Sequence, residues 1–328
     1  MYQTRIAGTG SYLPERVLTN FDLEKLVDTS DQWIRERTGI ERRHMAAPGQ
    51  TTSDLAYEAS QRALKAANMS ADDIDMIIFG TVTGDQLMPS TACYLQKKLG
   101  CAKTPAFDLA AACSGFVYSL TIAEHFIRAG TYKTILVVGA EVLHNFVNYK
   151  DRETCILFGD GAGAFVVTRA EKNDANVILS SHLMSVASLA DLLVLPAGGS
   201  KQPITHEILD QGGHYMKMKG REIFKNAVQT MSACCEETLK QNNVKAEDIS
   251  WLVPHQANFR IMEAVAERFG FPLEKVVNIV HEMGNTSAAT IPVAFDTAVR
   301  DGRIKRGQLI LLTTFGAGLT AGSMLLRY

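Results

Sequence analysis

The chain has 328 residues, of which 46% are hydrophobic and 21% are charged, and its formal net charge is −2 at pH 7. This near-neutral balance excludes the strong basic field of a general nucleic-acid binder, and the hydrophobic content excludes a disordered chain. The length predicts two packed halves or one large domain with a sizeable core.

The first residues, MYQTRIAGTGSYLP, lack a charged region followed by an apolar stretch, so we expect no secretory signal peptide. No apolar run approaches the ~20 residues that a membrane-spanning helix needs. The six cysteines contain no C-x-x-C pair, which argues against a disulfide framework and a zinc site. We therefore expect a cytoplasmic protein with no metal, no membrane segment and no nucleic-acid partner.

Two distant segments read alike: ALKAANMSADDIDMIIFG at 63–80 and TLKQNNVKAEDISWLVPH at 238–255. Each predicts a helix that ends near an asparagine, then a turn with an acidic pair, then a short apolar strand. Such self-similarity indicates an internal duplication.

A second pair of segments, 155–169 and 311–327, shares an apolar stretch, Phe-Gly, a small-residue turn and another apolar stretch. This pattern predicts a hairpin in each half. Because apolar strands alternate with helical stretches, the sequence predicts an α/β protein of two duplicated halves, which we assign to 1–172 and 173–328.

Several glycine patterns superficially resemble nucleotide-binding loops. GTGSYLP at 8–14 runs into a proline, and the glycines at 159–165 and 316–322 precede strand-like residues, so no helix start is available to hold a pyrophosphate. HEMGN at 281–285 lacks the second histidine of a zinc-protease motif. We therefore expect neither a dinucleotide cofactor nor a metal.

Cys113 lies between a predicted strand, PAFDLAAA, and a helix whose apolar positions recur up to Gly130. Most free cysteines are inert core residues, so a buried thiol and a nucleophile are both open interpretations. At a helix start, backbone N–H groups and the helix dipole would lower the pKa of the thiol. The Ala-x-Cys-x-Gly spacing also resembles a nucleophile elbow.

His255 directly follows the second duplicated strand, and Asn285 lies in GNTSAATIP at another predicted strand-to-helix junction. Alone, each has an ordinary structural explanation, a hydrogen-bonding histidine and a turn or N-cap asparagine. With Cys113 they suit either a papain-like hydrolase or a thioester condensation, in which both side chains stabilise an enolate. The duplicated α/β chain favours the condensation.

AAACSGF, WLVPHQAN and GNTSAATIP, in this order and at this spacing, resemble β-ketoacyl-acyl-carrier-protein synthase III, the initiating condensing enzyme of bacterial type II fatty-acid synthesis. TSDQWIRERTGIERR and FGDGAGA resemble the same family, and the resemblance runs from about Thr4 to Tyr328. It implies a thiolase-like five-layered αβαβα fold, a homodimer and a ping-pong reaction that needs no cofactor beyond its coenzyme A thioester substrate.

The resemblance also implies roles for individual residues. An acyl-CoA, with acetyl-CoA the commonest donor in the family, acylates Cys113, and His255 and Asn285 then promote decarboxylation of malonyl-acyl carrier protein. The backbone N–H groups of Cys113 and Ala317 form the oxyanion hole, although many relatives have glycine at the second position. Phe315 lines the malonyl side.

The remaining implied contacts are with coenzyme A and with the carrier protein. Trp33 and Arg152 are expected to sandwich the adenine, and Arg37 to bind phosphate. Because the carrier protein is acidic, Lys225 and Arg260 are expected to form its docking site. Without the resemblance, a packing tryptophan and solvated basic residues would be the simpler interpretation.

Met88 lies in the region that, in the family, reaches across the dimer to close the acyl pocket of the other subunit. Its flexible, mid-sized side chain does not choose between short and branched acyl groups. The alternatives are a related condensing enzyme of secondary metabolism, a non-decarboxylating thiolase-like or plain acyl-transfer enzyme, and an inactive binding subunit. The complete set of Cys113, His255 and Asn285 argues against the inactive subunit. Cys234 and Cys235 lie in a helical stretch remote from the glycine-rich turns, which argues against the thiolase.

Overall fold

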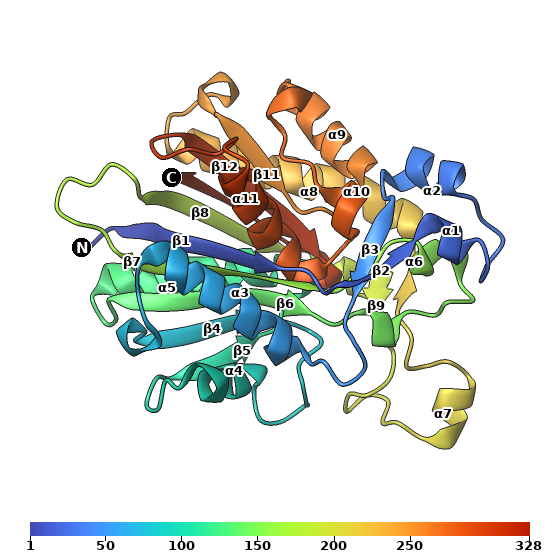
Figure 1. Cartoon of the computed structure of the whole chain (residues 1–328). Coiled ribbons are helices and arrows are strands. Elements are labelled where there is room, and N and C mark those ends of the chain that lie inside the picture. The colour runs from blue at the N-terminus through green and yellow to red at the C-terminus, as the bar shows by residue number, and fades with distance from the viewer.

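The computed structural model describes residues 1–328, and two sheets form its frame (Figure 1). The first sheet has five strands in the order β1-β7-β6-β4-β5, and the second has four in the order β11-β12-β13-β8. The strands are β1 (Thr4–Tyr12), β4 (Met76–Gly80), β5 (Ala106–Leu109), β6 (Thr134–Glu141), β7 (Gly161–Arg169), β8 (Ile178–Ser185), β11 (Trp251–Pro254), β12 (Leu309–Gly316) and β13 (Thr320–Arg327).

Helices cover both outer faces of the sheets and fill the space between them, which confirms the five-layered αβαβα architecture. A shared core cluster joins the two central helices to strands of both sheets. Separate clusters join the outer helices to the outer faces. The outer layer on the first sheet is α3 (Thr52–Ala67) and α4 (Thr91–Leu99), the central layer is α5 (Gly115–Ala129) and α11 (Thr290–Arg300), and the outer layer on the second sheet is α8 (Gly220–Gln241) and α9 (Phe259–Arg268).

No helix combines the length and the apolar composition that crossing a membrane requires.

Short elements complete the fold around one end of the sheets. The short elements are β2 (Arg16–Thr19), α1 (Asn20–Leu23), α2 (Asp31–Thr38), β3 (Arg42–Met45), α6 (Arg152–Cys155), β9 (Leu193–Val194), α7 (His206–Asp210), β10 (Lys217–Met218) and α10 (Val280–Met283).

The two sheets repeat one topology, which confirms the duplication. β4 pairs parallel with β6, and β11 pairs parallel with β12, while β7 and β13 each add an antiparallel strand. The helices α3 and α8 are both followed by a left-handed asparagine, Asn68 at φ 54° and Asn243 at φ 51°. A short 3₁₀ turn then leads into β4 or β11, as the repeated sequence predicts.

The predicted hairpin in the first half is wrong. Residues 155–158 form the end of α6 and a loop, whereas β12 and β13 do form a hairpin across a 3₁₀ turn. In the first half, β7 pairs instead with β6. The loop is held by the buried carboxylate of Asp160, which accepts the backbone N–H groups of Ala46 and Leu143. The division at 172 stays a prediction.

Candidate active site

Three polar residues that are far apart in the sequence line one cavity of about 780 Å³. They are Cys113, His255 and Asn285. The cavity also collects five of the other predicted site residues: Phe315, Trp33, Arg37, Arg152 and Arg260. Ala317, Met88 and Lys225 do not line it.

Cys113 sits in a 3₁₀ turn between β5 and α5, which confirms the predicted strand, turn and helix. The turn is tight, since Ala112 has a positive φ of 47°. Its backbone packs closely on the end of β12, where a Cβ added to Gly316 would lie 2.8 Å from the Cys113 nitrogen. Glycine is therefore required beside the thiol.

The resting thiol is not a thiolate, contrary to the sequence-based prediction. Cys113 is only 7% exposed, and burial, with the nearby charge of Glu141, raises the pKa of the thiol to about 12. Desolvation of the charged form is the largest cause of this shift. The thiol must therefore lose its proton during the reaction.

His255 is held at the end of β11 by a backbone hydrogen bond from its N–H to the carbonyl of Thr313, at 2.8 Å. Its Nδ1 lies 2.6 Å from Oγ1 of Thr290, while Nε2 is buried and has no hydrogen-bond partner. The ring meets Phe315 edge-on, with centroids 5.6 Å apart. Burial lowers the pKa of the imidazole to about 3, so it is neutral at physiological pH.

The residue after His255 anchors this strand end. The buried side-chain amide of Gln256 donates to the carbonyls of Pro254 and Val277, and its oxygen accepts the N–H of Ile279. All of its principal hydrogen-bonding groups are thus used within the chain. Gln256 therefore has a structural role: its side chain joins the chain around His255 to residues 277 and 279.

Asn285 is fixed at both its backbone and its side chain. Its N–H donates to the carbonyl of Leu157 at 2.8 Å, and its side-chain oxygen accepts the N–H of Ser287 at 2.9 Å. Gly284, at φ 65°, makes this approach possible, because an added Cβ would lie 2.7 Å from the same carbonyl. The amide oxygen is occupied, so the amide nitrogen is left to donate into the cavity.

A buried carboxylate behind the site was missed by sequence reasoning. Glu141, at the end of β6, accepts hydrogen bonds from the hydroxyls of Ser287 and Thr81 and from the N–H groups of Val82 and Thr83, at 3.0–3.1 Å. Burial raises its pKa to about 7, although these hydrogen bonds oppose the shift. A glutamate ending the apolar run TILVVGAE was the available signal, because an acidic group is rarely buried without partners.

At the mouth of the cavity, two guanidinium groups flank an indole ring. Cζ of Arg37 lies 4.7 Å from the centroid of Trp33, and Cζ of Arg152 lies 4.8 Å from it. Arg152 also donates to the carbonyl of Asp28 at 2.9 Å. These cation–π contacts gather two positive charges where a phosphate-bearing ligand would enter.

The three residues outside the cavity lie in different places. Ala317 is half-buried in the turn between β12 and β13, directly after Gly316 of the cavity wall. Lys225 is exposed on α8, one helical turn from Arg221 at the cavity mouth. Met88 is 82% exposed, in a loop that does not contribute to this cavity.

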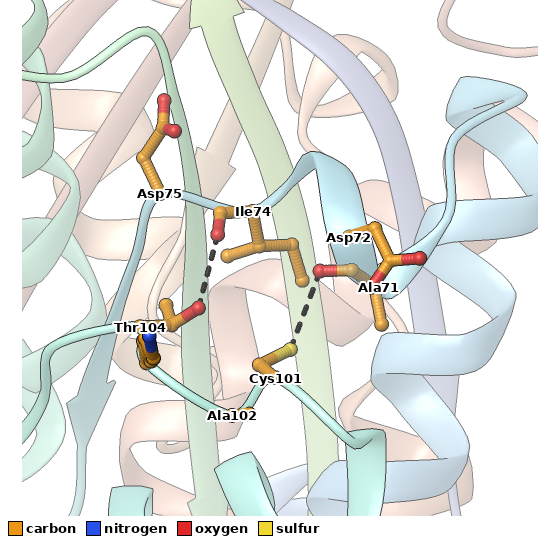
Figure 2. A pocket seen from close by; sticks show the side chains of 8 residues that line it. Ala71, Asp72, Ile74, Asp75, Cys101, Ala102 and Thr104 are labelled. Carbon is orange, nitrogen blue, oxygen red and sulfur yellow. Dashed lines mark hydrogen bonds between the residues drawn. The ribbon is translucent and has the colours of Figure 1, made fainter.

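A second hollow, of about 380 Å³, lies against the outer part of the first half (Figure 2). Two of its polar side chains are paired within the chain. The thiol of Cys101 donates to the carbonyl of Ala71 at 3.4 Å, and the hydroxyl of Thr104 donates to that of Ile74 at 3.1 Å. No group of three or more His, Cys, Asp or Glu side chains gathers anywhere in the chain to hold a metal ion. The hollow therefore contains no metal-ligand cluster and none of the predicted site residues.

Comparison with known proteins gives one consistent result. Residues 107–187 match the family model described as 3-oxoacyl-[acyl-carrier-protein (ACP)] synthase III, and residues 239–328 match the model of its C-terminal part. The chain is 54% identical to β-ketoacyl-[acyl-carrier-protein] synthase III of Xanthomonas campestris pv. campestris, over 99% of this chain and 98% of the relative. It is also 54% identical to that of Alkalilimnicola ehrlichii, over the full length of both.

The fold agrees equally well with a solved structure. The crystal structure of 3-oxoacyl-[acyl-carrier-protein] synthase III from Aquifex aeolicus VF5 superimposes with a TM-score of 0.91, at 48% sequence identity. The match covers 99% of this chain and 100% of that one.

Proposed function

The chain belongs to the β-ketoacyl-acyl-carrier-protein synthase III family, and we propose that both half-reactions of this acyltransferase take place around Cys113. The enzyme catalyses the decarboxylating condensation that initiates fatty-acid synthesis. The observation that carries the assignment of residues is that Cys113, His255 and Asn285 line one cavity although they come from separate turns, after β5, after β11 and after α10. The strand predicted directly before Asn285 is absent, because Val280–Met283 form the short helix α10.

In the first half-reaction, Sγ of Cys113 attacks the thioester carbonyl of an acyl-CoA. A sulfur–carbon bond forms, the bond to the CoA sulfur breaks, and the proton of the thiol ends on the departing CoA. The backbone N–H groups of Cys113 and Ala317 donate to the oxyanion of the tetrahedral intermediate. The tight contact of the thiol turn with Gly316 supports this arrangement, because it brings the two backbone segments together.

In the second half-reaction, malonyl-acyl carrier protein enters and loses CO₂. The electron pair of the broken carbon–carbon bond passes into an enolate, whose oxygen accepts hydrogen bonds from His255 and Asn285. The enolate carbon then attacks the acyl group, and Cys113 leaves as a thiolate that regains a proton. Fixed donors in a buried site stabilise the developing charge strongly, because no solvent must reorganise.

The proposal extends to the substrates and partners. Acetyl-CoA is the proposed starter, with the coenzyme bound at Trp33, Arg37 and Arg152. The acidic carrier protein would dock at Arg260, which lines the cavity, and at the exposed Lys225 on α8, on a protein whose formal net charge is only −2.

A homodimer in the cytoplasm completes the proposal. The side chains of Leu87 and Met88 are 96% and 82% exposed, and adjacent apolar side chains of this size are typical of a surface that a partner covers. In the dimer, this loop would close the acyl pocket of the other subunit.

Intact-protein mass spectrometry with a panel of acyl-CoAs tests the function. We expect a mass gain located on Cys113, which malonyl-acyl carrier protein discharges and CoA-free buffer does not. The donor that acylates fastest identifies the starter, and a clear preference for a long or branched chain would refute acetyl-CoA. No adduct from any donor would refute the acylation step itself.

A further inference from the structure

The two ring nitrogens of His255 have different surroundings. Nδ1 lies 2.6 Å from Oγ1 of Thr290, whereas Nε2 is buried without a partner. His255 is 1% exposed and Thr290 is 0% exposed, so bulk water does not compete for this contact. The hydroxyl of Thr290 therefore decides where the ring carries its proton.

The direction of these hydrogen bonds follows from a third group. Oγ1 of Thr290 lies 3.0 Å from the carbonyl oxygen of Ser287, and a carbonyl oxygen can only accept. With the single hydroxyl hydrogen on the Ser287 carbonyl, Oγ1 accepts from Nδ1–H. The network assigns the neutral tautomer with a lone pair on Nε2.

This tautomer raises a difficulty for the proposed decarboxylation, in which His255 has to donate. A neutral ring with its proton on Nδ1 has nothing to donate from Nε2. The condensation, however, consumes one proton, because malonate enters as a carboxylate and Cys113 leaves as a thiolate. A negative charge that enters beside the ring also favours its protonated form.

We propose that Thr290 is a positioning residue that keeps a proton on Nδ1, so that the proton consumed by the condensation enters and leaves the ring at Nε2. Nε2 takes this proton from solvent as the malonyl group binds. It donates to the thioester oxygen while the carbon–carbon bond breaks, and the proton passes to the Cys113 thiolate when the sulfur–carbon bond breaks. The ring returns to its neutral form, and Nδ1–H stays on Thr290 throughout.

The inference rests on the proposed roles of Cys113 and His255, and Thr290→Val tests it separately from them. Valine keeps the shape of threonine but leaves Nδ1–H without an acceptor. A hydrogen bond to a charged group stabilises by about 1.5–3 kcal/mol, so we expect kcat for condensation to fall about 10–100-fold. Acylation of Cys113 and KM for malonyl-acyl carrier protein should change by less than about threefold.

Two variants serve as controls. Thr290→Ser retains the hydroxyl and should restore kcat to within about threefold of the wild type. Thr121→Val removes another buried helix hydroxyl, which donates to the carbonyl of Val117 at 2.9 Å and touches no catalytic candidate; its kcat should match that of the wild type. Equal kcat for Thr290→Val and Thr290→Ser would overturn the inference, as would an equal loss of acylation and condensation in Thr290→Val.

Nitrogen-15 spectra of the unsubstituted, histidine-labelled enzyme give a test that does not depend on the folding of a variant. The His255 signals are those that His255→Gln removes, and they should show a protonated Nδ1 and an unprotonated Nε2 at rest. A resting ring with its proton on Nε2 would overturn the inference. A wild-type enzyme that is never acylated would instead refute the proposed function.

Discussion

The two halves of the molecule build the same turn and use it differently. A 3₁₀ turn leads directly into a central helix in both halves, at Ala112–Ser114 before α5 and at Ser287–Ala289 before α11. The first residue of each turn has a positive φ, 47° in one and 50° in the other. The second residue is Cys113 in the first half and Ala288 in the second, so a reactive thiol and an inert methyl occupy matching places.

Each turn packs against a strand of the other half. The turn of Cys113 lies on Gly316 of β12, and the turn of Ala288 lies on Gly139 of β6, where an added Cβ would be 2.4 Å from the Ala288 carbonyl oxygen. The strand ends differ, because β6 ends in the carboxylate of Glu141 and β12 in Gly316. The carboxylate fixes Ser287, whereas the glycine borders the catalytic cavity. The turn of the first half thus carries the reactive thiol, whereas the matching turn of the second half is an anchor that follows the catalytic candidate Asn285.

The largest expected effect comes from replacing the cysteine of the first turn, and the matching replacement in the second turn serves as its control. Cys113→Ala should abolish acylation, a loss of more than about 10³-fold, since no other group supplies a nucleophile. Ala288→Gly should retain acylation and lose only about 1 kcal/mol of stability. Intact-mass kinetics and urea unfolding measure the two effects. Acylation that persists in Cys113→Ala would show that the halves are not divided in this way.

A large but selective effect is expected when the donors of the second half are removed. His255→Ala or Asn285→Ala should lower the rate of malonyl decarboxylation about 10²–10³-fold, because each removes one donor to the enolate. Transfer of the acyl group from CoA to Cys113 should be nearly unchanged. Rapid-quench measurements separate the two steps, and an equal loss in both would assign these side chains to activation of the thiol.

The reciprocal packing predicts opposite defects from two glycine substitutions. Gly316→Ala and Gly139→Ala should each destabilise the fold by about 1–3 kcal/mol, because the new Cβ meets backbone atoms. The first should mainly slow acylation, since it displaces the N–H of Cys113. The second should mainly slow decarboxylation, since it displaces the turn that follows Asn285. Urea titration and the two half-reaction rates test this, and identical defects in both variants would contradict it.

The smallest effect concerns acid stability. The pKa of His255 is about 3 in the folded chain and 6.5 for an ordinary histidine, so the unfolded state binds the proton more tightly between these values. Its contribution to stability is therefore constant above pH 6.5 and falls as the pH drops, by about 2 kcal/mol at pH 5. The first half has glycine, Gly80, at the corresponding strand end. Urea unfolding at pH 7 and pH 5 should show a smaller acid loss in His255→Gln, and an unchanged loss would place the sensitivity elsewhere.

Local sequence patterns predict much of this arrangement. The repeated helix, turn and strand follow from hydrophobic periodicity, and the strand-turn-helix around Cys113 follows from its small residues. The similarity of segments 155–169 and 311–327 gave a wrong prediction in the first half. Phe-Gly followed by small residues is compatible both with a hairpin and with the loop that Asp160 anchors. The pKa of the thiol and the partner of Nδ1 depend on burial and on contacts over long sequence separations, which no local pattern contains.

The shared central layer also affects how the chain can fold while it is being synthesised. α5 and α11 lie between the sheets, and their apolar side chains pack with strands from both halves. When the first sheet leaves the ribosome, the helix α11 and the second sheet have not yet been synthesised, so one face of the nascent domain stays uncovered. A fragment that ends after β7 would carry that face permanently, and we expect it to aggregate. Because both halves share one core cluster, we expect them to fold as one cooperative unit after the last strand is released.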